Sequence, residues 1–533
     1  MEPESQLATH EVTNQPGPPK AGLWKDDPVL RDWAEVAGAQ DAALTAYAEV
    51  LGAEEMRAAG RDANRFGPEL VPFDRAGRRI DEVRYHPGYH RQMAAGIEAG
   101  YAGLPWEGTG GGHATHAAMV YLLSQVDPGV CCPMTMTYAG IPALAAAPEF
   151  SEWAEKLNAR AYDPRVAPLA EKAGATLGMA MTEKQGGSDV RMNTTRAEKT
   201  RDGWRLSGHK WFCSAPMSDG FLTLAQAPGG LSCFLVPRWL EGDRRNAVQV
   251  MRLKDKLGNR SNASAEIEYH GALALPLGAE GDGVRTILTM VHHTRLDTAM
   301  APAGLMRAAL AEAAHWARHR TVFQRRLVDQ PLMAAVLADL VLDWEGATAL
   351  GFRVARAFDD GAAEFARIAV ALAKFHANKR CPVVVAEAME CLGGMGYVED
   401  TGLPLFYREA PLNGIWEGSG NVICLDILRT LARVPAAREA LEAELEGALG
   451  VHAGYARALD GFRSAWKSGP DEAQARRFAE GLAGLLTAAV LLRGPAPGIG
   501  AAYVASRLSG PRGFAPGAGP AVDTAACLSR LGI

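Results

Sequence analysis

The spacing of apolar residues changes twice along the chain and divides it into three regions. Residues 25–175 are rich in alanine and interrupted by Pro-Gly pairs, a composition that predicts helices. Residues 176–283 contain short stretches in which apolar and polar side chains alternate around turns such as Pro228-Gly229-Gly230, which is the pattern of β-strands. After Gly283 the helical period returns, because four apolar residues share one helix face: Met306, Leu310, Ala313 and Ala317.

These patterns predict an α+β fold that is mainly α, with a helical bundle in its second half. Pro331 suits the first turn of the next long helix, and the glycines that follow Cys391 would end a third one. We expect five units: an extended or disordered arm (1–24), an N-terminal helical domain (25–175), a central β-barrel-like domain (176–283), a helical bundle (284–433) and a C-terminal helical extension (434–533).

Composition indicates a soluble globular enzyme. The 533 residues are 48% hydrophobic and 22% charged, and the net charge of −6 gives no overall attraction for nucleic acid or an anionic membrane. The apolar run from Leu482 to Leu492 is too short to span a bilayer, and the N-terminus has no signal-peptide pattern. Eight scattered cysteines without a Cys-x-x-Cys motif indicate a reduced, cytoplasmic protein. The His315–His319 pair lacks the acidic neighbour of a zinc-protease motif, so we expect no metal.

Two short segments, more than 200 residues apart, contain the chemically informative side chains. Met181–Asp189, followed by Gly208–Ser214, offers backbone amides, hydroxyls and an aromatic ring, a set suited to a flat, phosphorylated cofactor. Ile415–Asn421 places Glu417 between an indole and a glycine, where burial would raise its pKa and make it a usable base. The alternative interpretation is structural: an ordinary strand–turn–strand, and a glutamate that only begins a helix, where acidic residues are favoured.

The order of helices, β unit and bundle, together with six sequence blocks, resembles the acyl-CoA dehydrogenase family of flavoproteins over about residues 25–433. The chain is similar in particular to the AidB-like branch of this family, which is linked to the response to DNA alkylation. The blocks that carry the resemblance are Cys132–Thr137, Met181–Val190, Gly230–Phe234, Lys254–Ser264, Tyr407–Glu409 and Trp416–Asn421.

The resemblance implies a non-covalent FAD cofactor. Phe212 stands where many relatives have Trp, and Ser214 where they have Thr, so a flat apolar face and a hydroxyl donor are both preserved. The FAD-binding residues that it implies in the β domain and beside Glu417 are Met181, Thr182, Gly187, Ser188, Phe212, Ser214, Trp416, Ser419 and Asn421.

A second set of implied FAD contacts comes from the bundle of a neighbouring subunit, which leads us to expect a homotetramer built from dimers. A guanidinium such as that of Arg320 suits a diphosphate, because it is permanently charged and forked. Many relatives have Gln where Glu390 stands, and a carboxylate there would repel a diphosphate unless it turned toward ribose or a basic partner. The set is Arg320, Phe323, Glu390, Gly393 and Gly394.

The resemblance also implies the reaction. Glu417 would take the α-proton of an acyl-CoA or related thioester while hydride leaves the β-carbon for flavin N5, which gives a trans-2-enoyl product. The thioester oxygen would be polarised by the backbone N–H of Glu417 and a ribityl hydroxyl. Some relatives place the base near the segment that matches His292–Arg295, but this chain has no acid there. The implied substrate contacts are Ser188, Arg295 and Trp416.

The C-terminal extension raises a second function, namely a DNA-associated flavoprotein that protects DNA from alkylating agents or detoxifies them. Residues 431–533 contain eleven Lys or Arg and nine Asp or Glu, a net charge of +2 that leaves −8 for the rest. Non-specific binding to double-stranded DNA would need clustered cations. The candidate DNA contacts are Arg457, Arg463, Lys467, Arg476 and Arg477, although mixed charge on amphipathic helices more often forms a solvated face.

Overall fold

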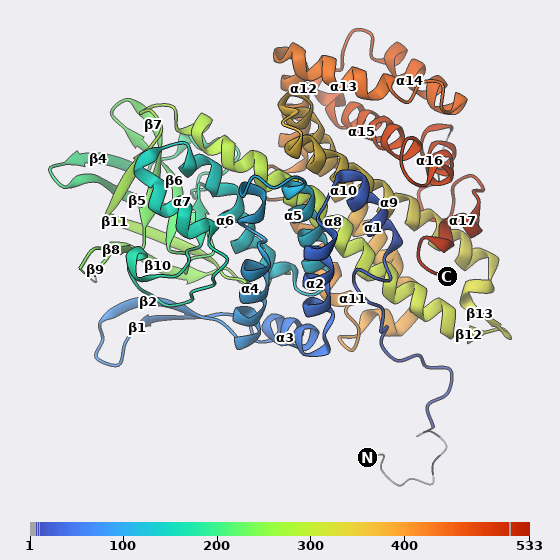
Figure 1. Cartoon of the computed structure of the whole chain (residues 1–533), viewed down its shortest axis with the longest axis horizontal. Helices are drawn as coiled ribbons and strands as arrows, with labels where there is room; N and C mark the ends of the chain where they lie inside the picture. Colours follow the sequence, from blue (N-terminus) through green and yellow to red (C-terminus); the bar gives the residue numbers. More distant parts are fainter. Residues whose placement is uncertain (1–6, 8, 10, 243, 511–512) are drawn as a thin grey trace.

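A computed structural model describes the whole chain except residues 1–6, 8, 10, 243 and 511–512. Figure 1 shows a β domain at one end of the long axis, helices in the middle, and a further layer of C-terminal helices over the bundle. The fold is α+β and mainly α, as the sequence predicts.

The N-terminal region consists mostly of short helices. Two of them begin with Pro directly after an Asp, and the carboxylate caps the helix: Asp27 accepts from the backbone N–H of Leu30 (2.9 Å), and Asp127 accepts from that of Gly129 (3.0 Å). The helices are α1 (Pro28–Ala37), α2 (Asp41–Gly52), α3 (Glu54–Arg65), α4 (Pro87–Ala99), α5 (Gly112–Ser124), α6 (Pro128–Ala145) and α7 (Ser151–Asn158). Because α5 and α6 are buried almost all round, they form the inner layer against the bundle.

One element departs from the expected all-helical N-terminal domain. Strands β1 (Glu69–Phe73) and β2 (Arg79–Arg84) form a hairpin, joined by a turn in which Oδ1 of Asp74 accepts the backbone N–H groups of Ala76 and Arg78. Most residues of both strands are partly buried, and their sequences lack the strict apolar–polar alternation that identifies a strand. The hairpin extends to the β domain, where Arg79 donates to the carbonyl of Val250 (3.1 Å).

The central β domain contains a closed ring of strands. Around the ring, β5, β4, β6, β7 and β11 pair in that order, and β11 returns to β5, while β3 pairs outside the ring with β6 and β10 with β11. The predicted Pro-Gly-Gly hairpin is confirmed, since Ala227 on β6 pairs with Gly230 on β7. The strands are β3 (Leu177–Ala180), β4 (Arg196–Thr200), β5 (Gly203–Ser214), β6 (Gly220–Ala227), β7 (Gly230–Pro237), β10 (Val248–Leu253) and β11 (Ser264–Leu277), beside a small pair β8 (Trp239–Leu240) and β9 (Arg244–Arg245).

Three long helices form the bundle: α8 (Gly283–His319), α9 (Pro331–Asp359) and α10 (Ala363–Cys391). A two-stranded hairpin joins α8 to α9, and shorter helices follow α10: β12 (Thr321–Val322), β13 (Arg325–Arg326), α11 (Leu403–Glu409) and α12 (Gly420–Arg433). Buried polar contacts tie the bundle to the N-terminal helices. Asp27 accepts from the Tyr121 hydroxyl on α5 (2.8 Å) and from Nε of Arg307 on α8 (3.0 Å), so a single carboxylate links three helices.

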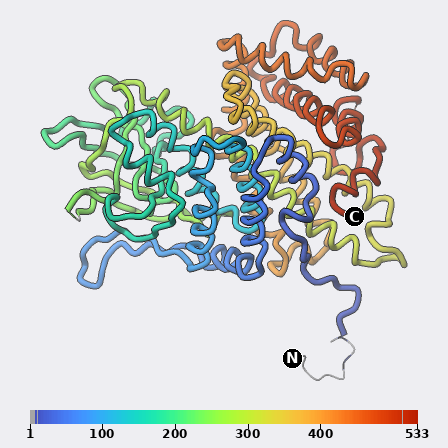
Figure 2. Tube along the Cα trace, in the orientation of Figure 1, coloured from blue at the N-terminus to red at the C-terminus, as the bar shows by residue number. Residues whose placement is uncertain are grey.

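The C-terminal extension packs directly on α9 and α10 (Figure 2). Its helices are α13 (Pro435–Glu446), α14 (Ala453–Ala465), α15 (Ala475–Leu492), α16 (Pro497–Tyr503) and α17 (Thr524–Ser529). Buried arginines fasten it: Arg507 pairs with Asp339 and Asp343 on α9, and Arg530 pairs with Glu345. In the part of the chain that the structure describes, no helix is both long and apolar enough to cross a membrane.

Part of the expected arm over residues 1–24 lies outside the described residues. Residues 11–22 contain neither helix nor strand, which agrees with an extended arm. The side chain of Asn14 donates to the carbonyl of Thr321 (2.7 Å) and accepts from its backbone N–H (2.7 Å). The arm therefore lies against the hairpin that joins α8 to α9.

Candidate functional site

Glu417 lies in a tight turn between α11 and α12, and its backbone adopts an unusual conformation. The φ angle is 56° at Glu417 and 101° at Gly418, so two consecutive residues lie in the left-handed region. A side chain other than glycine there costs about 1–3 kcal/mol, which surrounding contacts must offset. Nζ of Lys374 donates to the carbonyls of Asn413 (2.7 Å) and Gly418 (3.0 Å), and Nε of Arg295 approaches the carbonyl of Glu417 (3.4 Å). Two cations from α8 and α10 therefore hold the turn.

The Glu417 carboxylate is held by one hydroxyl. Oγ1 of Thr294 on α8 donates to its Oε2 at 2.6 Å. Burial raises the pKa of Glu417, and the Thr294 hydrogen bond and the charges of Lys374 and Arg295 only partly oppose that rise. Burial also lowers the pKa of Lys374, to about 7. The carboxylate is thus a stronger base than a solvated one.

Glu417 lines a cavity of about 30 Å³ between α5, α6, α8 and the Glu417 turn. Trp416 forms another part of its wall, and its indole Nε1 donates to Oδ1 of Asn413 (2.7 Å). Two further carboxyl groups face the cavity, Asp297 on α8 and Glu409 on α11. Burial raises the pKa of Glu409 to about 7, while its oxygens accept hydrogen bonds from the backbone N–H and the side-chain amide of Asn259.

The two segments that the sequence singles out meet at Cys132 on α6. The Cys132 thiol lines the cavity together with Glu417 and contacts the hydroxyl of Ser214 at the end of β5. Ser214 belongs to the β domain, whereas Glu417 follows the bundle. The fold therefore brings the predicted cofactor segment and the predicted base to the same region of the molecule.

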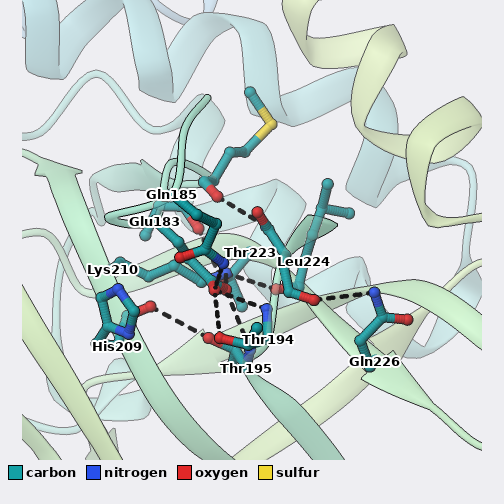
Figure 3. A network of polar contacts seen from close by, with 12 residues as sticks. Glu183, Gln185, Thr194, Thr195, His209, Lys210, Thr223, Leu224 and Gln226 are labelled. Atoms are coloured by element: carbon teal, nitrogen blue, oxygen red, sulfur yellow. Dashed lines mark hydrogen bonds and ion pairs between the residues drawn. The ribbon is translucent and has the colours of Figure 1, made fainter. Parts of the chain in front are cut away.

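The Met181–Ser188 loop is anchored by an ion pair that sequence reasoning missed. The side chains of Glu183 and Lys210 are fully buried and pair at 2.8 Å. The Glu183 carboxylate also accepts from the backbone N–H groups of Thr194 (2.7 Å) and Thr195 (3.2 Å), as Figure 3 shows. Burial works to raise the pKa of Glu183, but Lys210 and these donors hold it at about 2. The available signal was a lysine at an inward-facing position of an alternating strand.

The rest of this region presents open surfaces that fit a flat, phosphorylated group. Phe212 is 46% exposed, and Ser188 is exposed. A Cβ built on Gly186 meets no atom within 4 Å, so a ligand can approach the backbone there, whereas one on Gly187 would lie 2.5 Å from Oγ1 of Thr182. The first glycine keeps the loop accessible, and the second allows it to fold tightly on Thr182.

The residues predicted to contact the FAD of a neighbouring subunit lie far from the Phe212 region within their own chain. Figure 1 places the β12–β13 hairpin at the opposite end of the long axis from the β domain. Phe323 at its tip is 91% exposed, and the nearby Arg320 donates to the carbonyl of Asn14 (2.6 Å). Glu390 is exposed on α10, and Cβ atoms built on Gly393 and Gly394 would meet nothing within 4 Å. Within one chain, the hairpin cannot contribute to the surface around Phe212.

The predicted substrate contact Arg295 has two structural partners. Its Nη1 pairs with Oδ2 of Asp426 on α12 (2.7 Å), and its Nε faces the carbonyl of Glu417 (3.4 Å). It therefore shapes the turn, while Trp416 and Glu417 face the cavity themselves. Ser419 is the N-cap residue of α12 but makes no side-chain capping hydrogen bond, so its hydroxyl is not used to cap the helix.

The candidate DNA contacts do not form a uniform row of free cations. Arg463 is held by Glu442 (2.5 Å) and Glu446 (2.8 Å). Arg476 donates to Oδ1 of Asn421 at 2.9 Å, so the extension touches the Trp416–Asn421 block. The Arg477 guanidinium lies 5.8 Å from the Trp466 ring centre, and Arg457 and Lys467 are exposed. Among the described residues, no group of three or more His, Cys, Asp or Glu side chains is arranged to hold a metal.

Three domain families match consecutive parts of the chain. Residues 14–164 match the adaptive response protein AidB N-terminal domain, residues 178–272 the acyl-CoA dehydrogenase middle domain, and residues 281–432 the acyl-CoA dehydrogenase C-terminal domain. Over 436 residues the chain is 48% identical to AidB of Escherichia coli (strain K12). The aligned region covers 79% of this chain and 80% of that relative.

Solved structures agree in fold. Caenorhabditis elegans ACDH-11, in complex with C11-CoA, matches with a TM-score of 0.82 and 27% identity, covering 99% of this chain and 93% of that one. An acyl-CoA dehydrogenase from Bacillus anthracis, complexed with FAD, matches with a TM-score of 0.62 and 18% identity, covering 79% and 77%. The domain matches and the identity to AidB show that the chain belongs to the acyl-CoA dehydrogenase family, whose members bind FAD, and within it to the AidB-like proteins.

Proposed function

We propose that the protein oxidises an acyl-CoA or a related thioester at its α,β-bond, with Glu417 as the base. The observation that carries the proposal is the environment of Glu417: a buried carboxylate with a raised pKa that faces a cavity and is held by a single hydroxyl from Thr294. Removal of a weakly acidic C–H proton requires a stronger base than a solvated carboxylate, and a raised pKa makes Glu417 such a base. The CoA ester bound to ACDH-11 supports a CoA thioester as the substrate class.

In this reaction Glu417 accepts the α-proton while a C=C double bond forms between the α- and β-carbons. FAD, when bound, supplies the acceptor for the hydride that leaves the β-carbon. Within the part of the chain that the structure describes, the backbone N–H of Glu417 donates no hydrogen bond, so it is free to polarise the thioester oxygen. Lys374 and Arg295 hold the turn that aims this N–H.

We propose that FAD lies along the face that carries Phe212 and the Met181–Ser188 loop. Thr182, Ser188 and Ser214 offer hydroxyls there, and the open backbone at Gly186 permits close approach. The exposed Phe323 and Arg320 would reach the FAD of a second subunit, because their hairpin lies far from Phe212 in the same chain. This arrangement supports a homotetramer built from dimers.

Anaerobic titration of the FAD-loaded protein with a series of acyl-CoA esters tests the reaction, with loss of flavin absorbance as the signal. Glu417→Gln should abolish this loss while FAD and ligand still bind, because the exchange keeps the shape and removes the base, a term of about 10²–10⁴-fold. Glu312→Gln is the matched control, since burial raises the pKa of Glu312 to about 7 on a part of α8 away from the cavity. Flavin reduction at the wild-type rate in Glu417→Gln would assign the base to another residue.

A further inference from the structure

A buried histidine–aspartate pair lies beside the cavity that Glu417 lines, with Asp297 in the cavity wall. Nε2 of His116 on α5 lies 2.7 Å from Oδ1 of Asp297 on α8, and the two side chains are 0% and 4% exposed. Nδ1 of His116 lies 2.7 Å from the carbonyl oxygen of Tyr101. The second oxygen of Asp297 accepts from the hydroxyl of Thr135 on α6. Every polar atom of this pair therefore has a partner inside the protein.

The partners determine how many protons the pair holds. A backbone carbonyl can only accept, so Nδ1 of His116 must carry a proton. The 2.7 Å contact between Nε2 and Oδ1 needs one more proton, because two lone pairs at that distance would repel. That proton lies either on Nε2, which gives imidazolium and carboxylate, or on Oδ1, which gives two neutral groups. In both cases the net charge of the pair is zero.

Among the described residues, the cations around the cavity are bound to other groups, and Lys256 donates to the carbonyl of Asn262 (2.7 Å). Arg295 is already paired with Asp426, and Lys374 is bound to the carbonyls of the Glu417 turn. Burial lowers the pKa of His113 to about 3 and that of His293 below its usual range, so both rings are neutral near pH 7. The remaining titratable groups packed against the cavity or the pair are Tyr101, Tyr138, Cys131, Cys132, Lys256, Asp359 and Glu409.

We propose that His116 and Asp297 form a shared-proton pair of zero net charge, which leaves no uncompensated charge on Asp297 beside the cavity and so keeps Glu417 ionisable as a base. Both are positioning residues, because they act through Glu417, which lines the same cavity as Asp297. An uncompensated charge on Asp297 would raise the pKa of Glu417 further, since like charges disfavour the ionised form. The role of the pair in catalysis rests on the proposed function, whereas the zero net charge of the pair does not depend on it.

The charge of the pair can be measured without turnover. In the FAD-loaded protein without substrate, the infrared C=O band of protonated Glu417, identified by its absence in Glu417→Gln, is followed as the pH is raised. His116→Gln should raise the midpoint by about one pH unit or more if the shared proton lies on Nε2, because a carboxylate is then left, and should leave it unchanged if the proton lies on Oδ1 of Asp297. Asp297→Asn replaces a neutral pair with another neutral pair, so its midpoint should stay within about half a unit of wild type. In the double variant His116→Gln/Asp297→Asn the midpoint should also lie within about half a unit of wild type.

A midpoint lowered by about one unit or more in Asp297→Asn would show an uncompensated carboxylate and overturn the proposal. It is equally overturned if His116→Gln lowers the midpoint by that amount, or if the midpoint of the double variant lies about one unit or more from that of wild type. Should His116→Gln not fold, Asp297→Asn alone decides the outcome. Because the band is measured without substrate, a correct midpoint pattern in a protein whose flavin no thioester reduces would refute the proposed reaction and leave the pair intact.

Discussion

Replacing Thr294 with valine removes the hydroxyl that donates a 2.6 Å hydrogen bond to Oε2 of Glu417 and keeps the shape of the side chain. The hydrogen bond stabilises the ionised carboxylate and opposes the effect of burial on its pKa. Without it, the pKa of Glu417 should rise further. Since only the ionised form accepts a proton, the variant should need a higher pH to reach full rate.

The size of the shift follows from the charge on the acceptor. A hydrogen bond to an ionised group is worth about 1.5–3 kcal/mol, and one pKa unit corresponds to about 1.36 kcal/mol. The acidic limb of the pH–rate profile should therefore move up by about one to two units. At a pH below both limbs the rate of flavin reduction should fall by about 10–100-fold, while above both limbs the two proteins should agree.

Single-turnover flavin reduction by an acyl-CoA, recorded from acidic to alkaline pH, measures the limb directly. Thr348→Val is the matched control, because Thr348 is a buried helical threonine whose hydroxyl donates to the carbonyl of Trp344 (2.9 Å) on α9, away from the cavity. Its limb should coincide with that of wild type. A limb in Thr294→Val that is unmoved, or that shifts to lower pH, would refute the view that this hydrogen bond sets the charge state of Glu417.

Three further outcomes are expected. Lys210→Met leaves the fully buried Glu183 carboxylate without its cation, so the free energy of unfolding should fall by about 3–5 kcal/mol and FAD should bind more weakly. Urea unfolding and FAD titration measure these two changes, and unchanged values would contradict the view that this ion pair anchors the loop. Phe323→Asp places a charge on the 91% exposed hairpin tip, and light scattering should show smaller assemblies that release FAD; an intact tetramer with full FAD would contradict the shared site. If the extension binds duplex DNA, binding should be sequence-independent and should weaken with salt. Arg457→Ala should reduce the affinity more than Arg463→Ala, because two glutamates already neutralise Arg463. Equal losses of affinity in the two variants, or no shift of duplex DNA at low salt, would contradict DNA binding by these cations.

The sequence by itself determined the features that short segments encode. Alternation along residues 176–283 identified the β domain, Pro331 marked the start of α9, and the Ile415–Asn421 segment singled out Glu417 as the candidate base. Each of these signals depends on the backbone propensity of single residues or on the spacing of apolar side chains over a few residues. The β1–β2 hairpin was missed because its apolar–polar alternation is weak.

The tertiary structure decided what surrounds Glu417, the proposed base, and what holds the Met181–Ser188 loop, the proposed cofactor site. Thr294 lies 123 residues before Glu417, and His116 lies 181 residues before Asp297. In sequence, these side chains look like ordinary polar residues of helices, as Lys210 looks like a residue of a strand. Burial and charge compensation depend on segments that are distant along the chain, so only the packing of α5, α6, α8 and α10 could show which polar side chains meet and with what charge.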